Sequence, residues 1–347
     1  MNRLFVMFFL TSFLVTACAN QATPPSETSP ISGGDATRSK RSVIIDTDMA
    51  LDDWIAILYV LQHPDVEVIA ITVTGTGEAH CGPGVAHALE LVYLAGEAGI
   101  PVTCGREFPL EGNHAFPDDL RARVDELAGL DLPDSPESPA SQGAVELMTD
   151  LISNSGTRIT ILTLGPLTNL GEALGAEPAL AQEIEMVYIM GGAVSVPGNL
   201  AFAGIDNQVS EWNIYIDPKA AQLVLDSGAP LTLIPLDVTN LAPLTVDFLD
   251  RLGEVAQTPE AEFVFRSLTQ YSEFIAQGYY FWDPLAAAAL TDEESFTFEA
   301  LELQVILEDG SHSGQTIQQG EGASVRVAIG VDNRQFEQLL IDVLNSE

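Results

Sequence analysis

The chain has 347 residues, of which 46% are hydrophobic, and this is enough apolar material for a compact globular protein. Its 50 acidic residues far outnumber its 13 basic residues, which gives a formal net charge of −37 at pH 7. A surface this negative excludes binding to nucleic acid or to anionic lipid through charge.

The first residues of the chain have the pattern of an export signal. A short apolar run ends in Val15-Thr16-Ala17-Cys18, which resembles the cleavage box of bacterial lipoproteins. This resemblance implies a signal peptide over residues 1–17 and lipidation of the Cys18 thiol. We therefore expect an exported lipoprotein on the periplasmic or extracellular face, with membrane contact through the lipid anchor only. The alternative is a plain secretory signal in which the cysteine occurs by chance.

Residues 18–41 are rich in Pro, Ser, Thr and Gly, and we expect a flexible tether there. The remainder, residues 42–347, shows no internal repeat and no second hydrophobic domain. It also contains no run of roughly 18 apolar residues, the length that a transmembrane helix needs. We predict a single domain over residues 42–347.

The domain opens with a strand, a loop rich in carboxylates and a helix. Residues 43–45 form a continuous apolar run, as in a parallel strand that is buried on both faces, and residues 54–61 have a helical pattern. Four carboxylates lie between them within eight residues, namely Asp46, Asp48, Asp52 and Asp53. Carboxylates this close repel one another unless a cation lies among them, and hard oxygen ligands favour Ca²⁺ or Mg²⁺ over zinc. If Asp52 and Asp53 only stabilised the helix N-terminus, Asp46 and Asp48 would have no role.

Strands and helices alternate over most of the remaining chain, which is typical of an α/β fold with a mostly parallel open sheet covered by helices. Further strands are predicted over residues 66–75, 100–104, 159–164, 187–190 and 231–236. The C-terminal third differs. Two long helical patterns over about residues 250–290 precede a small antiparallel element at one sheet edge, with strands over residues 303–307 and 324–330. Asp332 is expected to cap the last helix.

Residues 105–139 lack a clear period, and we expect a functional flap with a short helix near residues 118–127. Cys81 and Cys104 precede this flap. They either pair in an oxidising compartment or remain buried free thiols, and both alternatives stay open because their separation in space does not follow from the sequence.

The motif Asp46-Thr47-Asp48-Met49-Ala50-Leu51-Asp52-Asp53 after an apolar strand resembles the opening motif of the inosine-uridine preferring nucleoside hydrolases. Three later blocks resemble that family in the same order: Leu164-Gly165-Pro166-Leu167-Thr168-Asn169, Met190-Gly191-Gly192 with the segment up to Asn213, and Trp282-Asp283-Pro284. The resemblance implies Ca²⁺ held by Asp48 and Asp53 with Asp52 beside them, by the backbone carbonyl of Leu164, and by Asp283. It also implies a nucleoside substrate and a homodimer or homotetramer.

The resemblance further implies hydrolysis of the N-glycosidic bond through an oxocarbenium-like ribosyl cation, with Asp48 as the base that takes a proton from the attacking water. Ribose hydroxyls are expected to bind Asn199, Glu211 and Asn213. Thr76 stands where the family has an asparagine, and the sequence leaves open whether Thr76, Glu78 or His80 faces the sugar.

Trp282 occupies the position that is histidine in the inosine-uridine group, and this is similar to the purine-preferring group. An indole there stacks on a purine and assists its departure, which favours purine nucleosides as substrates. Alternatively, Trp282 is only a core residue. Because the usual histidine is missing, the main rival function is a non-catalytic nucleoside- or ribose-binding lipoprotein. A phosphatase of the haloacid dehalogenase type is disfavoured, since its later lysine has few candidates in a chain with so few basic residues.

Overall fold

The computed structural model describes residues 40–270, 272–275, 278–320 and 322–346. The predicted signal peptide, Cys18 and most of the predicted tether lie outside these residues. The compact unit spans Ser39–Glu347, and its first strand is β1 (Arg41–Thr47). In the part of the chain that the structure describes, no helix has both the length and the apolar character needed to cross a membrane.

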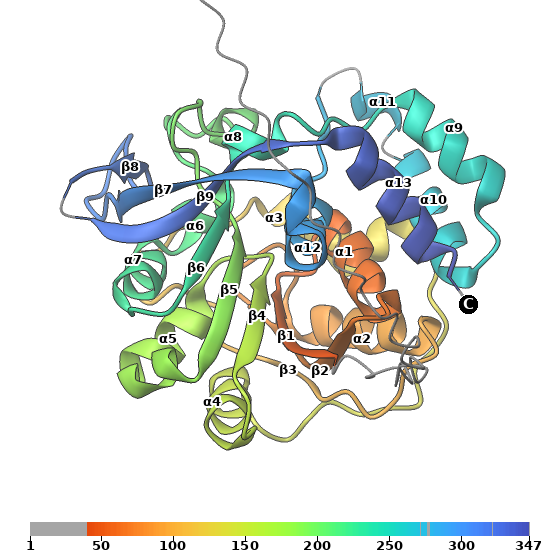
Figure 1. Ribbon diagram of the computed structural model, residues 1–347, viewed down its shortest axis with the longest axis horizontal. Coiled ribbons are helices and arrows are strands. Elements are labelled where there is room, and N and C mark those ends of the chain that lie inside the picture. The colour runs from red at the N-terminus through yellow and green to blue at the C-terminus, as the bar shows by residue number, and fades with distance from the viewer. Residues whose placement is uncertain (1–39, 271, 276–277, 321, 347) are drawn as a thin grey trace, which may run out of the picture. The chain divides into compact units, whose positions relative to one another are not determined.

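The described residues form one nine-stranded sheet with the order β3-β2-β1-β4-β5-β6-β9-β7-β8 (Figure 1). All neighbours from β3 to β9 are parallel, whereas β7 is antiparallel to β9 and β8 is antiparallel to β7. The strands after β1 are β2 (Val66–Val73), β3 (Val102–Cys104), β4 (Ile159–Thr163), β5 (Ile184–Met190), β6 (Leu231–Ile234), β7 (Phe296–Val305), β8 (Thr316–Gln318) and β9 (Ala323–Val331). The predicted mostly parallel α/β sheet with an antiparallel element near the C-terminus is confirmed.

Both faces of this sheet are covered by helices, and this explains the apolar run of residues 43–45 in β1. Val43 and Ile45 are buried in one core and Ile44 in the other, because successive side chains of a strand point to opposite faces. The first core includes residues of α1 (Leu51–Gln62), α2 (Cys81–Leu94), α9 (Val246–Val255), α10 (Pro259–Gln270), α12 (Asp283–Thr291) and α13 (Asn333–Leu344). The second includes residues of α4 (Ala144–Asn154), α5 (Thr168–Ala176) and α7 (Pro218–Asp226) (Figure 1).

The prediction of two long helices over about residues 250–290 is wrong. The described part of this region holds α9, α10, the short α11 (Ser272–Ile275) and α12. Pro259 begins α10 and Pro284 lies in the first turn of α12, because proline fits the first turn of a helix but cannot continue one. Asp332 caps α13 as predicted, since its side chain accepts a hydrogen bond from the Gln335 backbone N–H.

The C-terminal strands extend the main sheet. The pairing of β7 with β9 runs from Phe296 opposite Val331 to Leu303 opposite Ala323, which makes both strands longer than predicted. Because β9 also pairs with β6 in parallel, the antiparallel element continues the same sheet. Because β2, β1, β4 and β5 are parallel neighbours, their carboxyl ends lie at the same edge of the sheet, where ligand sites of such sheets lie.

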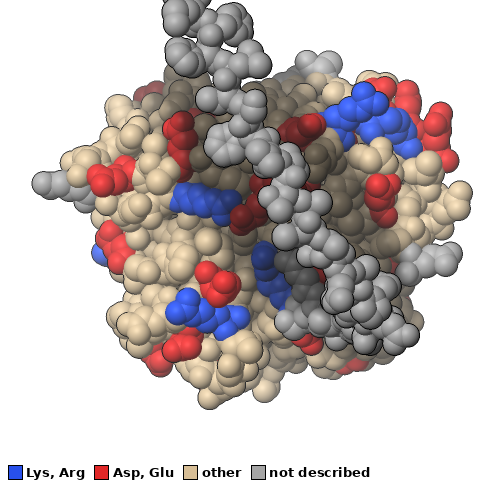
Figure 2. All heavy atoms as spheres, in the orientation of Figure 1, with Lys and Arg blue, Asp and Glu red and all other residues tan. Residues whose placement is uncertain are grey.

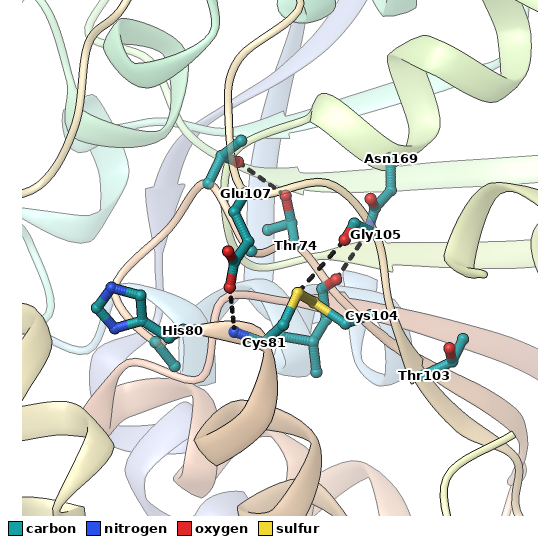
Figure 3. The surroundings of a disulfide bond; sticks show 12 residues. Thr74, His80, Cys81, Thr103, Cys104, Gly105, Glu107 and Asn169 are labelled. Carbon is teal, nitrogen blue, oxygen red and sulfur yellow. Dashed lines mark hydrogen bonds between the residues drawn. A yellow bond between two sulfur atoms is a disulfide. The ribbon is translucent and has the colours of Figure 1, made fainter.

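A disulfide joins Cys81, the first residue of α2, to Cys104, the last residue of β3 (Figure 3). The structure thus selects the paired alternative for these two cysteines. The Cys81 backbone N–H also donates to Glu107 in the flap. The bond therefore fixes the start of α2 to the point where the flap leaves the sheet.

Candidate active site

Asp48 follows β1 and lies in a narrow slot between two glycines. A side chain on either Gly77 or Gly165 would overlap the Asp48 side chain. The Glu78 backbone N–H donates to Asp48 Oδ2 at 3.0 Å, and the Ala79 N–H donates to the Asp48 carbonyl at 2.9 Å. The next residue, Met49, has a positive φ of 61°, which is uncommon for a residue with a side chain. This backbone conformation costs conformational free energy at the turn. The loop is therefore built to hold the Asp48 carboxylate in one direction.

Three carboxylates from two helix N-termini meet beside Asp48. Asp52 and Asp53 lie in the first turn of α1, and Asp283 is the first residue of α12. One oxygen from each lies within 4.8 Å of the others, and all three side chains are buried. Thr47 donates its hydroxyl to Asp53, and the Asp283 N–H donates to Asp52 Oδ2 at 3.4 Å. The two helix dipoles favour negative charge at this place.

Desolvation dominates the electrostatics of this cluster. Burial raises the pKa of Asp48, and the charge of Asp53 raises it further, to well above its usual range. Burial and then the charges of Asp52 and Asp53 do the same to the pKa of Asp283. The pKa of Asp52 is raised to about 7 by burial first and by Asp53 second. The cluster therefore needs either protons or a cation to compensate its charge.

A divalent cation fits this donor set. Asp53 Oδ2 and Asp283 Oδ1 are buried and have no hydrogen-bond partner among the described residues, so each is free to coordinate. All the donors are oxygen atoms, which suits a hard cation such as Ca²⁺ or Mg²⁺. The structure thus brings Asp52, Asp53 and Asp283 into one cluster that could hold a cation, and Asp48 lies next to Asp53.

Asp46 belongs to a different group of contacts. Its Oδ1 accepts hydrogen bonds from Thr72 Oγ1 at 2.7 Å and from Asn169 Nδ2 at 2.8 Å. Asn169 Nδ2 also donates to the Val73 carbonyl, so Asp46 ties β1 to β2 and to α5. Burial raises the pKa of Asp46 to about 7.

The predicted ribose-binding residues form a connected group at the ends of β4 and β5. Glu211 caps α6 (Trp212–Ile216) and accepts hydrogen bonds from the backbone N–H groups of Gly192 and Asn213, both at 2.9 Å. Asn213 Nδ2 donates to the carbonyls of Leu164 at 2.9 Å and Met190 at 3.2 Å. The Leu164 carbonyl, the predicted metal ligand, retains its second lone pair.

Asn199 Oδ1 accepts a hydrogen bond from the Trp212 N–H, so this predicted ribose ligand also fixes the start of α6. The aromatic packing around α6 does not follow from residue spacing along the chain. His114 of the flap stacks on Tyr215 with ring centroids 4.0 Å apart, and Phe116 stacks on Trp212 with ring centroids 4.7 Å apart. The flap thus packs against α6 through these two aromatic contacts.

The loop after β2 places its three candidate residues differently. Thr76 is buried, and its hydroxyl bonds those of Thr74 and Thr168, each at 2.9 Å. His80 points to the flap, where its Nδ1 lies 2.7 Å from Asp125. The charges of the acidic cluster act on Glu78. Burial first and then the charges of Asp52 and Asp53 raise the pKa of Glu78 to about 8. A histidine in this loop is also a candidate general acid for the leaving group, and the contact of His80 with Asp125 in the flap gives that role no support.

Trp282 lies directly before Asp283, half-buried against two tyrosines. Its ring meets Tyr279 nearly edge-on, with centroids 5.0 Å apart, and Tyr280 at 5.9 Å. The indole Nε1 has no hydrogen-bond partner among the described residues. Trp282 therefore precedes a carboxylate of the acidic cluster in the chain, while its ring packs on the two tyrosines and its buried N–H makes no hydrogen bond with the described residues.

Comparisons with known proteins find relatives that align with most of the chain. The family model for inosine-uridine preferring nucleoside hydrolase matches residues 43–338. A pyrimidine-specific ribonucleoside hydrolase, RihA, of Shewanella baltica is 33% identical over 88% of this chain and 96% of its own. Uridine nucleosidase 1 of Arabidopsis thaliana is 30% identical over 78% of this chain and 79% of its own.

Two solved structures have the same fold. The plant nucleoside hydrolase PpNRh1 superposes with a TM-score of 0.80 and 28% identity, over 88% of this chain and 99% of its own. The purine-preferring ribonucleoside hydrolase of Gardnerella vaginalis gives 0.76 and 27%, over 88% of this chain and 98% of its own.

Proposed function

This chain belongs to the inosine-uridine preferring nucleoside hydrolase family, and on that premise we propose that it cleaves purine nucleosides in a Ca²⁺-dependent reaction centred on Asp48. Hydrolysis of the nucleoside N-glycosidic bond is the reaction of the family, and the chain is accordingly an enzyme. The metal and the base preference are the parts that we propose.

The observation that carries the metal proposal is the trio of buried carboxylates with unpartnered oxygens on Asp53 and Asp283. We assign Asp48, Asp52, Asp53 and Asp283, with the Leu164 carbonyl, as the ligands. When bound, Ca²⁺ supplies charge compensation and makes a water molecule more acidic. Asp48 takes the proton of the attacking water, and its slot between Gly77 and Gly165 fixes where that proton goes.

The other residues of the site bind and polarise the sugar. Positive charge develops on the ribose in an oxocarbenium-like transition state, and the buried carboxylates favour that charge. Asn199, Glu211 and Asn213, with Thr76 at the edge, are proposed to bind ribose hydroxyls. Each already bonds the protein in the structure, so these side chains are held in place before the substrate arrives.

The preference for purines rests on Trp282. The names of the relatives point both ways, since RihA is called pyrimidine-specific and the Gardnerella vaginalis protein purine-preferring. The half-buried indole of the residue before Asp283 offers a large stacking surface, which meets Tyr279 nearly edge-on in the structure. A purine presents more ring area than a pyrimidine, so it gains more from this contact.

The test is ribose release from inosine and from uridine by the full-length chain, with Ca²⁺ and then with chelator. We expect chelator-sensitive release that is faster from inosine, and a Trp282→Ala variant that loses more activity on inosine than on uridine. Equal rates on both substrates would remove the purine proposal. Release that persists in chelator would remove the metal proposal.

We also propose that the chain is an exported lipoprotein anchored through Cys18. The Val15–Cys18 motif supports this, and so does the Cys81–Cys104 disulfide, because disulfides persist in oxidising compartments. Labelling cells with a clickable fatty acid should mark the wild-type protein and leave Cys18→Ser unlabelled. We further propose a homodimer or homotetramer, which light scattering of the purified protein tests directly.

A further inference from the structure

The loop of residues 74–80, which follows β2, makes every contact that fixes Asp48 from one side. Gly77 closes the slot, and the backbone N–H groups of Glu78 and Ala79 donate to the Asp48 carboxylate and carbonyl. If this loop moved outward, the Asp48 carboxylate would lose the hydrogen bond that it accepts from the Glu78 N–H. Something must therefore hold the loop from its outer side.

Helix α3 (Asp118–Asp125) of the flap does this through Arg121. The Arg121 side chain is buried, and its Nη2 donates to the carbonyl of Gly75 at 2.9 Å and to that of Ala79 at 3.2 Å. These two carbonyls lie on either side of Gly77 and Glu78. One guanidinium therefore spans the segment that touches Asp48.

Asp125 lies four residues later, on the same face of α3, and holds the end of the loop. Its Oδ1 accepts a hydrogen bond from the His80 backbone N–H at 2.9 Å, and its Oδ2 lies 2.7 Å from His80 Nδ1. Asp125 thus contacts both the backbone and the imidazole of His80, a residue 45 positions earlier in the chain. Figure 3 shows His80 at the start of α2 beside the Cys81–Cys104 disulfide, which fixes the residue that follows.

We propose that Arg121 and Asp125 are positioning residues, which hold the loop of residues 74–80 against Asp48 and so fix the direction of the Asp48 carboxylate. This inference rests on the proposed function of Asp48 as base and metal ligand. A buried guanidinium is costly unless its donors are used, and here one nitrogen, Nη2, donates to two backbone carbonyls of this loop, whereas the buried Nε has no partner among the described residues.

The test compares Arg121→Met, Arg121→Lys and Asp125→Asn with Asp119→Asn, an exposed aspartate on the same helix. We expect kcat for inosine to fall roughly 10- to 100-fold in Arg121→Met, since small displacements of catalytic groups have effects of this size, with KM little changed. Arg121→Lys should recover much of the loss because an ammonium group also donates to two carbonyls. Asp125→Asn should show an intermediate loss, and Asp119→Asn should match the wild type.

A second readout does not depend on turnover. Ca²⁺ is added to each variant and the rise in melting temperature is measured, because an ill-positioned Asp48 weakens the metal site. We expect a smaller rise for Arg121→Met and Asp125→Asn than for Asp119→Asn. If Arg121→Met fails to fold, Asp125→Asn carries the test, since Asp125 is partly exposed.

A lower melting temperature with unchanged kcat and an unchanged response to Ca²⁺ would show that α3 is only structural, and this would overturn the proposal. If the wild type releases ribose from no nucleoside, the proposed function fails. The response to Ca²⁺ then still decides whether Arg121 and Asp125 position Asp48.

Discussion

Asp48 is held by its neighbours at a place where its charge is unfavourable without a cation. Burial and the charge of Asp53 act against its ionised form. We expect Asp48→Asn to lower kcat at least roughly 100-fold, the usual contribution of a positioned base, while the melting temperature in chelator stays the same or rises. Ribose release and thermal unfolding measured on the same sample check this. A variant that retains turnover would exclude Asp48 as the base.

Gly165 tests the slot from the other side. A Cβ on Gly165 would lie 2.7 Å from Asp48 Cβ and 2.9 Å from the Asp48 backbone nitrogen, so Gly165→Ala must displace Asp48 or the turn itself. We expect kcat to fall roughly 10- to 100-fold. The control is Gly175→Ala within α5, where the new Cβ would lie 3.5 Å from Leu223 Cδ1, an ordinary contact. Gly175→Ala should leave kcat unchanged and stabilise the helix by up to about 1 kcal/mol.

The site residues divide by whether local sequence reveals them. Asp48, Asp52 and Asp53 follow from one motif, and Asp283 was found through a later block of the same family resemblance. Arg121 and Asp125 were not predicted, because a flap without periodicity gives no indication of which carbonyls its side chains reach. The hydrogen bonds of Glu211 to Gly192 and Asn213 likewise depend on how β5 and α6 meet in space.

At the scale of elements, buried strands were predictable and helix boundaries less so. The run Val43–Ile45 has to be apolar because it faces both cores, and β1 was therefore clear from sequence. The region from 250 to 290 was not, because helical periodicity alone does not show that Pro259 and Pro284 each start a new helix. The second start matters for function, since it places Asp283 at a helix N-terminus that faces α1.

The disulfide between α2 and β3 has a predictable effect on stability. Cys81 and Cys104 are 23 positions apart, and closing a loop of this size usually stabilises a protein by about 2–4 kcal/mol. We expect the double variant Cys81→Ser with Cys104→Ser to unfold at lower urea concentration than the wild type. Wild-type protein treated with a reductant should behave like the double variant, and identical midpoints with and without reductant would contradict the prediction.

At the scale of the whole molecule, carboxylates far outnumber basic groups. On the face shown in Figure 2, acidic and basic side chains are interspersed and do not gather into one patch. Several of the few cations lie beside carboxylates, as in Arg106 with Glu172 at 3.6 Å and Arg326 with Glu293 at 2.7 Å. The Arg326–Glu293 pair is half-buried and bidentate, but an exposed pair such as Arg106–Glu172 contributes little to stability. The net charge of −37 therefore acts mainly as a general repulsion that salt screens.

The buried carboxyls add a dependence of stability on pH that has a definite sign. Burial raises the pKa values of Asp46 and Asp52 from 3.8 to about 7. Between these values the folded chain binds more protons than the unfolded chain, so the free energy of unfolding falls as pH rises from about 4 to about 7. Each carboxyl contributes up to about 1.4 kcal/mol per pH unit within that window.

Urea unfolding in chelator at several pH values between 5 and 8 measures this slope, and the chelated protein should be most stable at the acidic end. Asp52→Asn should flatten the slope because its side chain binds no proton in either state, whereas the exposed Asp119→Asn should not. Added Ca²⁺ should also flatten it, since a cation at the cluster replaces the protons that compensate the carboxylates. Metal-free protein that is as stable at pH 8 as at pH 5 would show that these carboxyls ionise in the folded chain without cost, and the charge argument for a cation site would then fail.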